Sequence, residues 1–106
     1  MTKQAVKLIN LTENFDQLLI LWRACFPEDA DFGKTFLKEA APYAKIFGIY
    51  ESGTLVSCAY CLPATFYDDA QQFMSYYIYG VGTLQEHRGK GYAKAILEYI
   101  KQVVPC

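Results

Sequence analysis

The spacing of apolar residues along the chain separates helical from extended segments. Between residues 15 and 26 the apolar side chains recur three, four and seven positions apart, which is the periodicity of one face of a helix. This first stripe consists of Phe15, Leu18, Leu19, Trp22 and Phe26. Pro27 ends the first helix, and a second helix is expected between Glu28 and Pro42. The inner face of the second helix is predicted to contain Phe32, Phe36 and Ala40.

Segments rich in β-branched and aromatic residues predict four strands. We expect these strands within residues 3–10, 45–50, 55–62 and 72–84. The second and third strands surround a short turn that contains Gly53, which predicts a hairpin. Pro63 lies near the end of the third strand, where a missing N–H does the least harm, and residues 67–71 form a polar turn before the fourth.

A last apolar stripe predicts a helix from Tyr92 to Val103, which Pro105 ends. Its buried side is expected to consist of Ala93, Ile96, Leu97, Ile100 and either Val103 or Val104. The predicted order of elements is therefore β-α-α-β-β-β-α. This order indicates a single α+β domain over residues 1–106, with a mostly antiparallel mixed sheet flanked by helices.

Composition excludes several classes of protein. The 106 residues suffice for one domain with one core, and 53% of them are hydrophobic, which is too many for a disordered segment. Ten basic and eleven acidic residues leave a net charge of −1, so we expect no global basic surface for nucleic acid or an anionic membrane. No apolar run approaches the roughly 20 residues that span a bilayer, and the N-terminus lacks a secretory signal. We therefore expect a cytoplasmic location.

Cys58 and Cys61 have the spacing of a redox pair or of half a zinc site. Both fall in a predicted strand, in which side chains three positions apart point to opposite faces. No second pair of Cys or His residues stands nearby in the sequence. We therefore expect two buried thiols and no metal site.

The most informative segment runs from Gly80 to Lys94, where a predicted strand leads through a glycine-rich basic turn into the last helix. Such a turn directs backbone N–H groups and a helix N-terminus at one point, which suits a pyrophosphate. A P-loop would need glycine in place of Leu84, and a dinucleotide-binding turn would need glycine at position 85 or 94. An ordinary turn between a strand and a helix is the simpler alternative.

The sequence Arg88-Gly89-Lys90-Gly91-Tyr92-Ala93 matches the pattern Arg/Gln-x-x-Gly-x-Gly/Ala and resembles the Gcn5-related N-acetyltransferases (GNAT). By the order of its elements, nearly the whole chain resembles the N-terminal part of that family's domain. The resemblance implies an incomplete acyl-CoA N-acyltransferase fold, acetyl-CoA as co-substrate and no metal. The implied contacts to acetyl-CoA are Val81, Gly82, Thr83, Arg88, Gly89, Lys90, Gly91, Tyr92, Ala93 and Lys94.

The residues of the turn have physical roles that fit this resemblance. Gly89 and Gly91 lack the side chains that would keep a phosphate away from the backbone. The first turn of the last helix offers N–H groups without helical partners. Arg88 and Lys90 flank the turn and are placed to reach phosphate oxygens, although main-chain donors are the safer expectation.

Residues 81–83 resemble the family strand whose backbone pairs with pantetheine. That arrangement requires a bulge, which Gly80 and Gly82 suit, although an ordinary kink is the simpler interpretation of two glycines. In the family, a backbone N–H of this strand stabilises the oxyanion that forms when an amine attacks the thioester.

No residue is assigned as the catalytic acid or base. The family commonly uses a tyrosine beyond the next strand as the acid, and this sequence does not reach that strand. The candidates for a base are Glu86, His87, Tyr76, Tyr77 and Tyr79. Glu86 and His87 belong to the loop on the phosphate side, and the tyrosines alternate across a strand, so some of them face the core and others the substrate.

Three functions remain open. The first is an acetyl-CoA-dependent N-acetyltransferase, or a fragment of one, that acts on an unidentified primary amine. The second is an acyl-CoA-binding module without turnover, and the third is a remnant that binds nothing. The segment of residues 77–84, together with Tyr92, also resembles the N-terminal domain of larger acetyltransferases of the enhanced-intracellular-survival type.

The open edge of the fourth strand, beside Phe73, Tyr76 and Tyr77, predicts a homodimer. The two copies are expected to meet through this strand or through the adjoining face of the Tyr92–Val103 helix.

Overall fold

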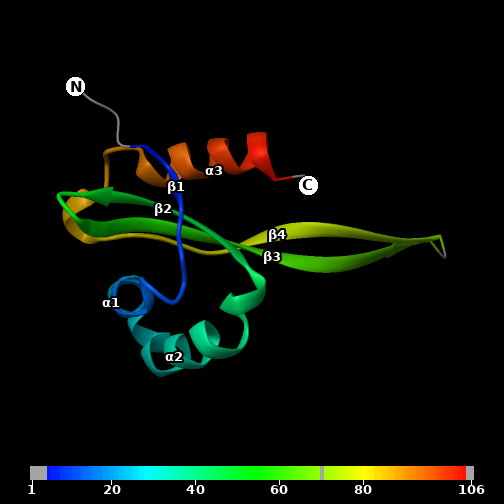
Figure 1. Ribbon diagram of the computed structural model, residues 1–106, viewed down its shortest axis with the longest axis horizontal. Coiled ribbons are helices and arrows are strands. Elements are labelled where there is room, and N and C mark those ends of the chain that lie inside the picture. Colours follow the sequence, from blue (N-terminus) through cyan, green and yellow to red (C-terminus); the bar gives the residue numbers. More distant parts are fainter. Residues whose placement is uncertain (1–4, 70, 105–106) are drawn as a thin grey trace.

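A computed structural model describes residues 5–69 and 71–104 of the chain. In this part of the chain one antiparallel sheet, in the order β1-β2-β3-β4, separates α1 and α2 on one face from α3 on the other (Figure 1). The strands are β1 (Lys7–Leu8), β2 (Lys45–Glu51), β3 (Thr54–Asp68) and β4 (Gln71–Thr83). The helices are α1 (Phe15–Cys25), α2 (Ala30–Glu39) and α3 (Tyr92–Val103). The predicted α+β class is confirmed, while every pairing among the described strands is antiparallel.

The helices follow the predicted apolar stripes, with corrections in α2. Pro27–Asp29 form a separate 3-10 turn, so α2 begins at Ala30 and not at Glu28. Phe32 is 48% exposed, although its ring still packs at 6.1 Å from that of Trp22. α3 has the predicted bounds, and its last buried residue is Val104. The other buried helix residues are Leu18, Leu21, Trp22, Gly33, Phe36, Leu37, Ile96 and Ile100.

β3 is longer than the sequence predicts. It continues beyond Leu62 to Asp68, and Pro63 lies within it, opposite Tyr76 of β4. The pairing of β2 with β3 ends at Cys61, so Pro63 has a neighbouring strand on one side and its missing N–H costs no bond on the other. The predicted polar turn at residues 67–71 is therefore shorter, because β3 includes Asp68 and β4 begins at Gln71. Residue 70 lies outside the described part of the chain, as do residues 3–4 of the first expected strand and Pro105 after the last helix.

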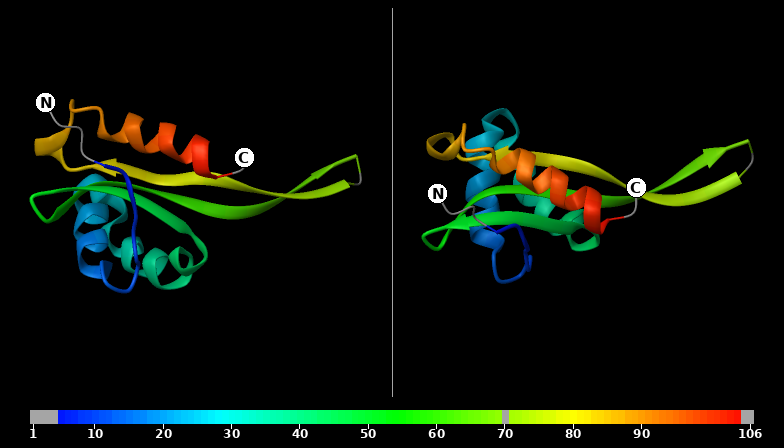
Figure 2. Two further views of the ribbon diagram at one scale, coloured as in Figure 1. Left: turned by 45° about the horizontal axis from the view of Figure 1, so that its top comes forward. Right: turned by 90° about the horizontal axis from the view of Figure 1, so that it is seen from above.

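Beyond Lys45, where β2 begins, β3 and β4 continue as a two-stranded arm that extends away from the helices (Figures 1 and 2). Near the tip, Tyr67 is 75% exposed and Met74 is 69% exposed. Within the described residues β3 is the one neighbour of β4, so the other side of β4 is an edge of the sheet.

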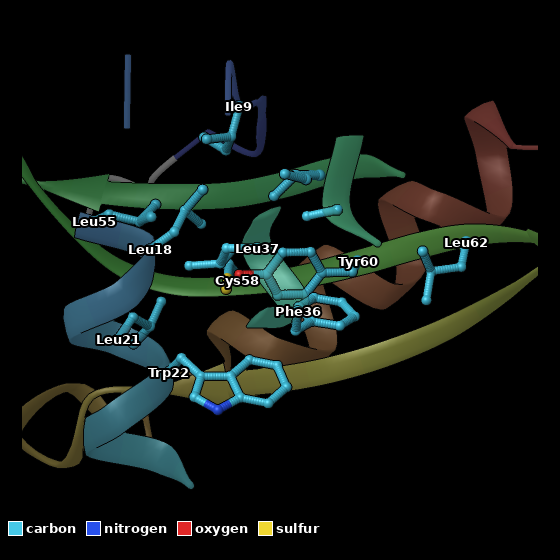
Figure 3. Packing of buried hydrophobic residues seen from close by; sticks show 12 residues of the cluster. Ile9, Leu18, Leu21, Trp22, Phe36, Leu37, Leu55, Cys58, Tyr60 and Leu62 are labelled. Atoms are coloured by element: carbon cyan, nitrogen blue, oxygen red, sulfur yellow. The ribbon is translucent and has the colours of Figure 1, made fainter. Parts of the chain in front are cut away.

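Two apolar clusters lie on opposite faces of the sheet. Figure 3 shows the first, in which Trp22 and Phe36 stack at 4.9 Å and the ring of Tyr60 meets Phe36 edge-on at 5.0 Å. The second lies under α3. Cys58 belongs to the first cluster and Cys61 to the second, which confirms that these two side chains point to opposite faces. Burial raises the pKa of the Cys58 thiol to about 12, so this thiol stays neutral.

Candidate functional site

β4 departs from regular pairing where it passes α1. Cys58 lies opposite Gly82 and Tyr60 lies opposite Tyr79, so two residues of β4, Gly80 and Val81, face a single residue of β3. This is a β-bulge, and Gly80 has a positive φ of 64° in it. The bulge that the glycines predict is therefore confirmed, and it lies on the edge strand of the sheet.

Side chains of β3 and α1 approach this part of β4 so closely that neither glycine has room for a Cβ. A Cβ on Gly80 would lie 2.9 Å from Cδ2 of Tyr60 in β3 and 3.2 Å from Cζ3 of Trp22 in α1, and one on Gly82 would lie 2.8 Å from Sγ of Cys25 in α1. The contacts at 2.9 Å and 2.8 Å are shorter than packed atoms tolerate. The backbone of the bulge is thus held against α1 by direct packing.

Below the bulge, the end of β4 is held by polar contacts. The carbonyl oxygen of Thr83 accepts hydrogen bonds from Nε of Arg88 at 3.0 Å and from Sγ of Cys25 at 3.4 Å. Ser57 Oγ donates to the carbonyl of Gly82 at 3.1 Å and lies 2.8 Å from Oγ1 of Thr83. Arg88, expected to reach phosphate oxygens, therefore uses its Nε to tie the loop to the strand.

The loop between β4 and α3 consists of a 3-10 turn, Gln85–His87, followed by the two expected glycines. Gly89 has a φ of 85° and Gly91 has a φ of 79°, a conformation that favours glycine. Apart from the adjoining residues of the loop, no described protein atom lies within 4 Å of a Cβ built on either of them. Among the described residues, the N–H groups of Gly89, Lys90 and Gly91 have no acceptor. The loop therefore presents open backbone donors beside the N-terminus of α3, as the phosphate hypothesis requires.

A carboxylate from a distant part of the chain contacts this loop. Glu51, at the end of β2, accepts hydrogen bonds from the hydroxyl of Tyr92 at 2.5 Å and from Nζ of Lys90 at 3.1 Å, and lies 3.1 Å from Nδ1 of His87. The hydrogen bond from Tyr92, and then Lys90, hold the pKa of Glu51 below its usual value. The same hydrogen bond raises the pKa of Tyr92. Lys90 thus contacts a carboxylate of its own chain.

A cleft of about 230 Å³ opens beside the bulge. Gly80 and Val81 form one side of the cleft, and residues at the end of α1 and in the following 3-10 turn form the other. The remaining lining residues are Trp22, Phe26, Asp29 and Tyr79. The ring of Tyr79 lies 6.1 Å from that of Trp22 and 5.2 Å from that of Phe36, which places it on the α1 face of the sheet. This cleft gives a small molecule access to the bulged backbone.

The structure separates the residues considered as bases. Glu86 is exposed in the loop and His87 contacts Glu51, so both lie on the phosphate side as expected. Tyr76 packs with the cluster under α3, on the face opposite to the cleft. Tyr79 is the one of the five that lines the cleft. The sequence offered no signal for Glu51, whose partners are 36 to 41 positions away.

The described residues contain no group of three or more His, Cys, Asp or Glu side chains that could hold a metal ion. None of the helices in residues 5–69 and 71–104 is long and apolar enough to cross a membrane.

The chain is similar to known proteins in both sequence and fold. A family model described as an acetyltransferase (GNAT) domain matches residues 6–103. Among curated proteins, no sequence matches the chain.

Several solved structures share the fold. A probable N-acyltransferase from Enterococcus faecalis has a TM-score of 0.74 and 20% identity, over 97% of this chain and 28% of that one. An aminoglycoside N-acetyltransferase, AAC(6')-Iy, in complex with CoA has a TM-score of 0.73 and 15% identity, over 96% of this chain and 69% of that one. A ribosomal-protein-alanine N-acetyltransferase from Brucella melitensis has a TM-score of 0.66 and 20% identity, over 94% and 70%.

The chain spans little more than a quarter of the first of these proteins, and identities at this level establish the fold alone. The family rests on a different observation, because the family model extends over nearly all of the described residues and includes the bulged strand and the glycine-rich loop. The chain therefore belongs to the acetyltransferase (GNAT) domain family.

Proposed function

We propose that this chain binds acetyl-CoA and takes part in the transfer of its acetyl group to a primary amine. One observation carries the proposal: the bulged edge strand runs directly into a loop of open backbone donors at the N-terminus of α3. A ligand with an extended polar chain and a pyrophosphate matches these two features in order. The CoA bound to AAC(6')-Iy, a protein of the same fold, supports this choice of ligand.

In this proposal the pyrophosphate binds the N–H groups of residues 89–94. Anions are favoured there because the donors lack partners and the helix dipole points at them. Pantetheine lies along Val81, Gly82 and Thr83, on the side of β4 that has no neighbouring strand. Because Arg88 and Lys90 already contact Thr83 and Glu51, the main-chain donors carry most of the phosphate binding.

The thioester then lies at the bulge, next to the cleft that Trp22, Asp29 and Tyr79 line. The amine enters through this cleft. Its nitrogen forms a bond to the thioester carbonyl carbon, the C–S bond breaks, the amine loses a proton, and the CoA sulfur gains one. A backbone N–H of the bulge stabilises the oxyanion that forms between these events.

An acyl-CoA-binding module without turnover is the second candidate. It is favoured by the positions of the groups considered as bases, since Glu86, His87 and Tyr76 all lie away from the cleft. General acid or base groups typically contribute about 10² to 10⁴ in rate, so a site without them would bind acetyl-CoA and transfer its acetyl group very slowly.

Two measurements on the chain separate these candidates. Calorimetry with acetyl-CoA tests binding, and thiol release in the presence of a panel of primary amines tests transfer. Binding with thiol release supports the transferase, and binding without it supports the module. If acetyl-CoA does not bind, both candidates are wrong.

We also propose that the chain forms a homodimer through the open edge of β4. The outer half of that strand carries exposed apolar side chains, with Tyr77 46% exposed and Ile78 38% exposed, and an unpaired edge invites another strand. Light scattering at tens of micromolar protein is expected to give the mass of two chains.

We also propose that the chain is the N-terminal domain of a larger enzyme of the enhanced-intracellular-survival type. The E. faecalis protein supports this proposal, because this chain matches only 28% of its length.

A further inference from the structure

Glu51 lies in a part of the molecule that the proposed reaction does not use. It is the last residue of β2, at the β2–β3 turn, and its carboxylate reaches across to the loop before α3. There it contacts Lys90, Tyr92 and His87. The Glu51 side chain is 26% exposed and the His87 side chain is 22% exposed. A single half-buried carboxylate thus contacts three residues of one short loop.

The positions of these three residues define what the contacts can do. His87 precedes the first glycine, Lys90 lies between Gly89 and Gly91, and Tyr92 is the first residue of α3. Glycines at positive φ with open space around them restrict the backbone least of all residues. Without a tie between its two ends, such a loop samples many conformations, and ordering it on binding costs free energy.

We propose that Glu51 is a positioning residue that holds the backbone donors of residues 89–91 in the arrangement that binds the phosphates of CoA. This inference rests on the proposed function, because it names CoA as the ligand. Glu51 acts through Tyr92, Lys90 and His87 and does not itself contact the phosphates.

Because Glu51 is negatively charged, the direction in which its removal changes CoA binding distinguishes a purely electrostatic role from a positioning role. A carboxylate near an anion site repels the anion and also neutralises Lys90, so by charge alone its removal would strengthen binding. As a tie between both ends of the loop, its removal would weaken binding. Ion pairs close to solvent contribute little to the stability of a fold, so the loss of this one leaves the fold intact.

The test compares Glu51→Ala and Glu51→Gln with Glu86→Ala. Glu86 is an exposed acid in the same loop, so its variant removes an equal charge without removing these contacts. The dissociation constants of CoA and of S-acetylpantetheine, which lacks the pyrophosphate, are measured by NMR titration at pH 7. Backbone NMR order parameters of residues 89–91 are measured on the same samples without ligand.

We expect Glu51→Ala to weaken CoA binding by about tenfold and to leave S-acetylpantetheine binding unchanged, as the loss of a preordered loop requires. Glu51→Gln keeps one acceptor for Tyr92 and is expected to lie between Glu51→Ala and wild type. Glu86→Ala is expected to bind CoA at least as tightly as wild type. The order parameters of residues 89–91 should be lower in Glu51→Ala than in the other proteins.

Equal or tighter CoA binding by Glu51→Ala overturns the inference, and so does an equal loss for CoA and S-acetylpantetheine. If wild type binds no CoA, the proposed function is wrong. In that case the order parameters still decide whether Glu51 orders the loop, and unchanged order parameters overturn that part as well.

Discussion

Two pairs of glycines in the same segment of chain serve different purposes. Gly80 and Gly82 lie in the bulged strand, where a Cβ would lie 2.9 Å from Tyr60 or 2.8 Å from Cys25. Gly89 and Gly91 lie in the loop before α3, where no described atom other than those of the adjoining residues lies within 4 Å of a Cβ. The first pair is required by packing within the protein, and Gly80 also has a positive φ of 64°. The second pair is required by its positive φ, and the space in front of it is left to a ligand.

The comparison shows that a glycine-rich motif does not have a single physical explanation. In the strand, the glycines let α1 contact β4 and thereby support the bulge. In the loop, they let the backbone turn so that its N–H groups face outward. Substitutions in the strand should therefore act on stability, and substitutions in the loop should act on ligand binding.

The largest effect on stability is expected at Gly80, which combines a positive φ with a close contact. Gly80→Ala should lower the free energy of unfolding by about 2–4 kcal/mol, from strain in the left-handed region and from overpacking against Tyr60 and Trp22. Urea unfolding measures this change. Gly53→Ala is the matched control, because Gly53 has a φ of 81° with nothing near its Cβ, so it carries the strain alone. Equal losses in both variants would remove packing as the explanation.

The largest effect on binding is expected at Gly91. Gly91→Asp places a negative charge at the open loop and should weaken CoA binding by more than about thirtyfold, by repulsion of the pyrophosphate. Calorimetry measures the affinity. Gly53→Asp carries the same charge at a similar φ in the β2–β3 turn and should retain most of the affinity. CoA binding by Gly91→Asp that matches wild type would falsify the assignment of the loop as the phosphate site.

A smaller effect on stability is expected at Gly82, where the close contact is with Sγ of Cys25 and φ is not positive. Gly82→Ala should cost about 1–3 kcal/mol by overpacking. Adding Cys25→Ala removes the sulfur and should restore part of the loss, measured as non-additivity in a double-mutant cycle. Additive losses would show that the Cys25 contact does not limit this position.

The smallest effect concerns the ionisation of Tyr92. Its pKa is raised above the usual value of 10.0 by its hydrogen bond to Glu51, so its contribution to stability is complete below pH 10 and is lost as pH rises through the raised pKa. Ultraviolet titration of wild type minus Tyr92→Phe isolates this tyrosine. The same subtraction is made between Glu51→Ala and the double variant Glu51→Ala/Tyr92→Phe. There Tyr92 should ionise at lower pH than in wild type, and an unchanged midpoint would mean that Glu51 does not hold the Tyr92 hydroxyl in solution.

Local patterns predicted much of this molecule. The bounds of α3, the β2–β3 hairpin and the opposite orientation of Cys58 and Cys61 follow from spacing along the chain. The bulge at Gly80 is implied by the family resemblance, which the two glycines of the strand suit. These features depend on interactions within a few residues, in which helix and strand periodicities and the backbone freedom of glycine dominate.

Tertiary structure decided the rest. β3 extends through Pro63 because β2, which begins at Lys45 opposite Cys61, does not lie beside it. Phe32 lies on the predicted inner face of α2 and is nevertheless 48% exposed. Glu51 meets the loop before α3 only because the β2–β3 turn and the end of β4 lie at the same end of the sheet. Such contacts join residues tens of positions apart, and the periodicity of either segment carries no information about which distant side chain will meet it.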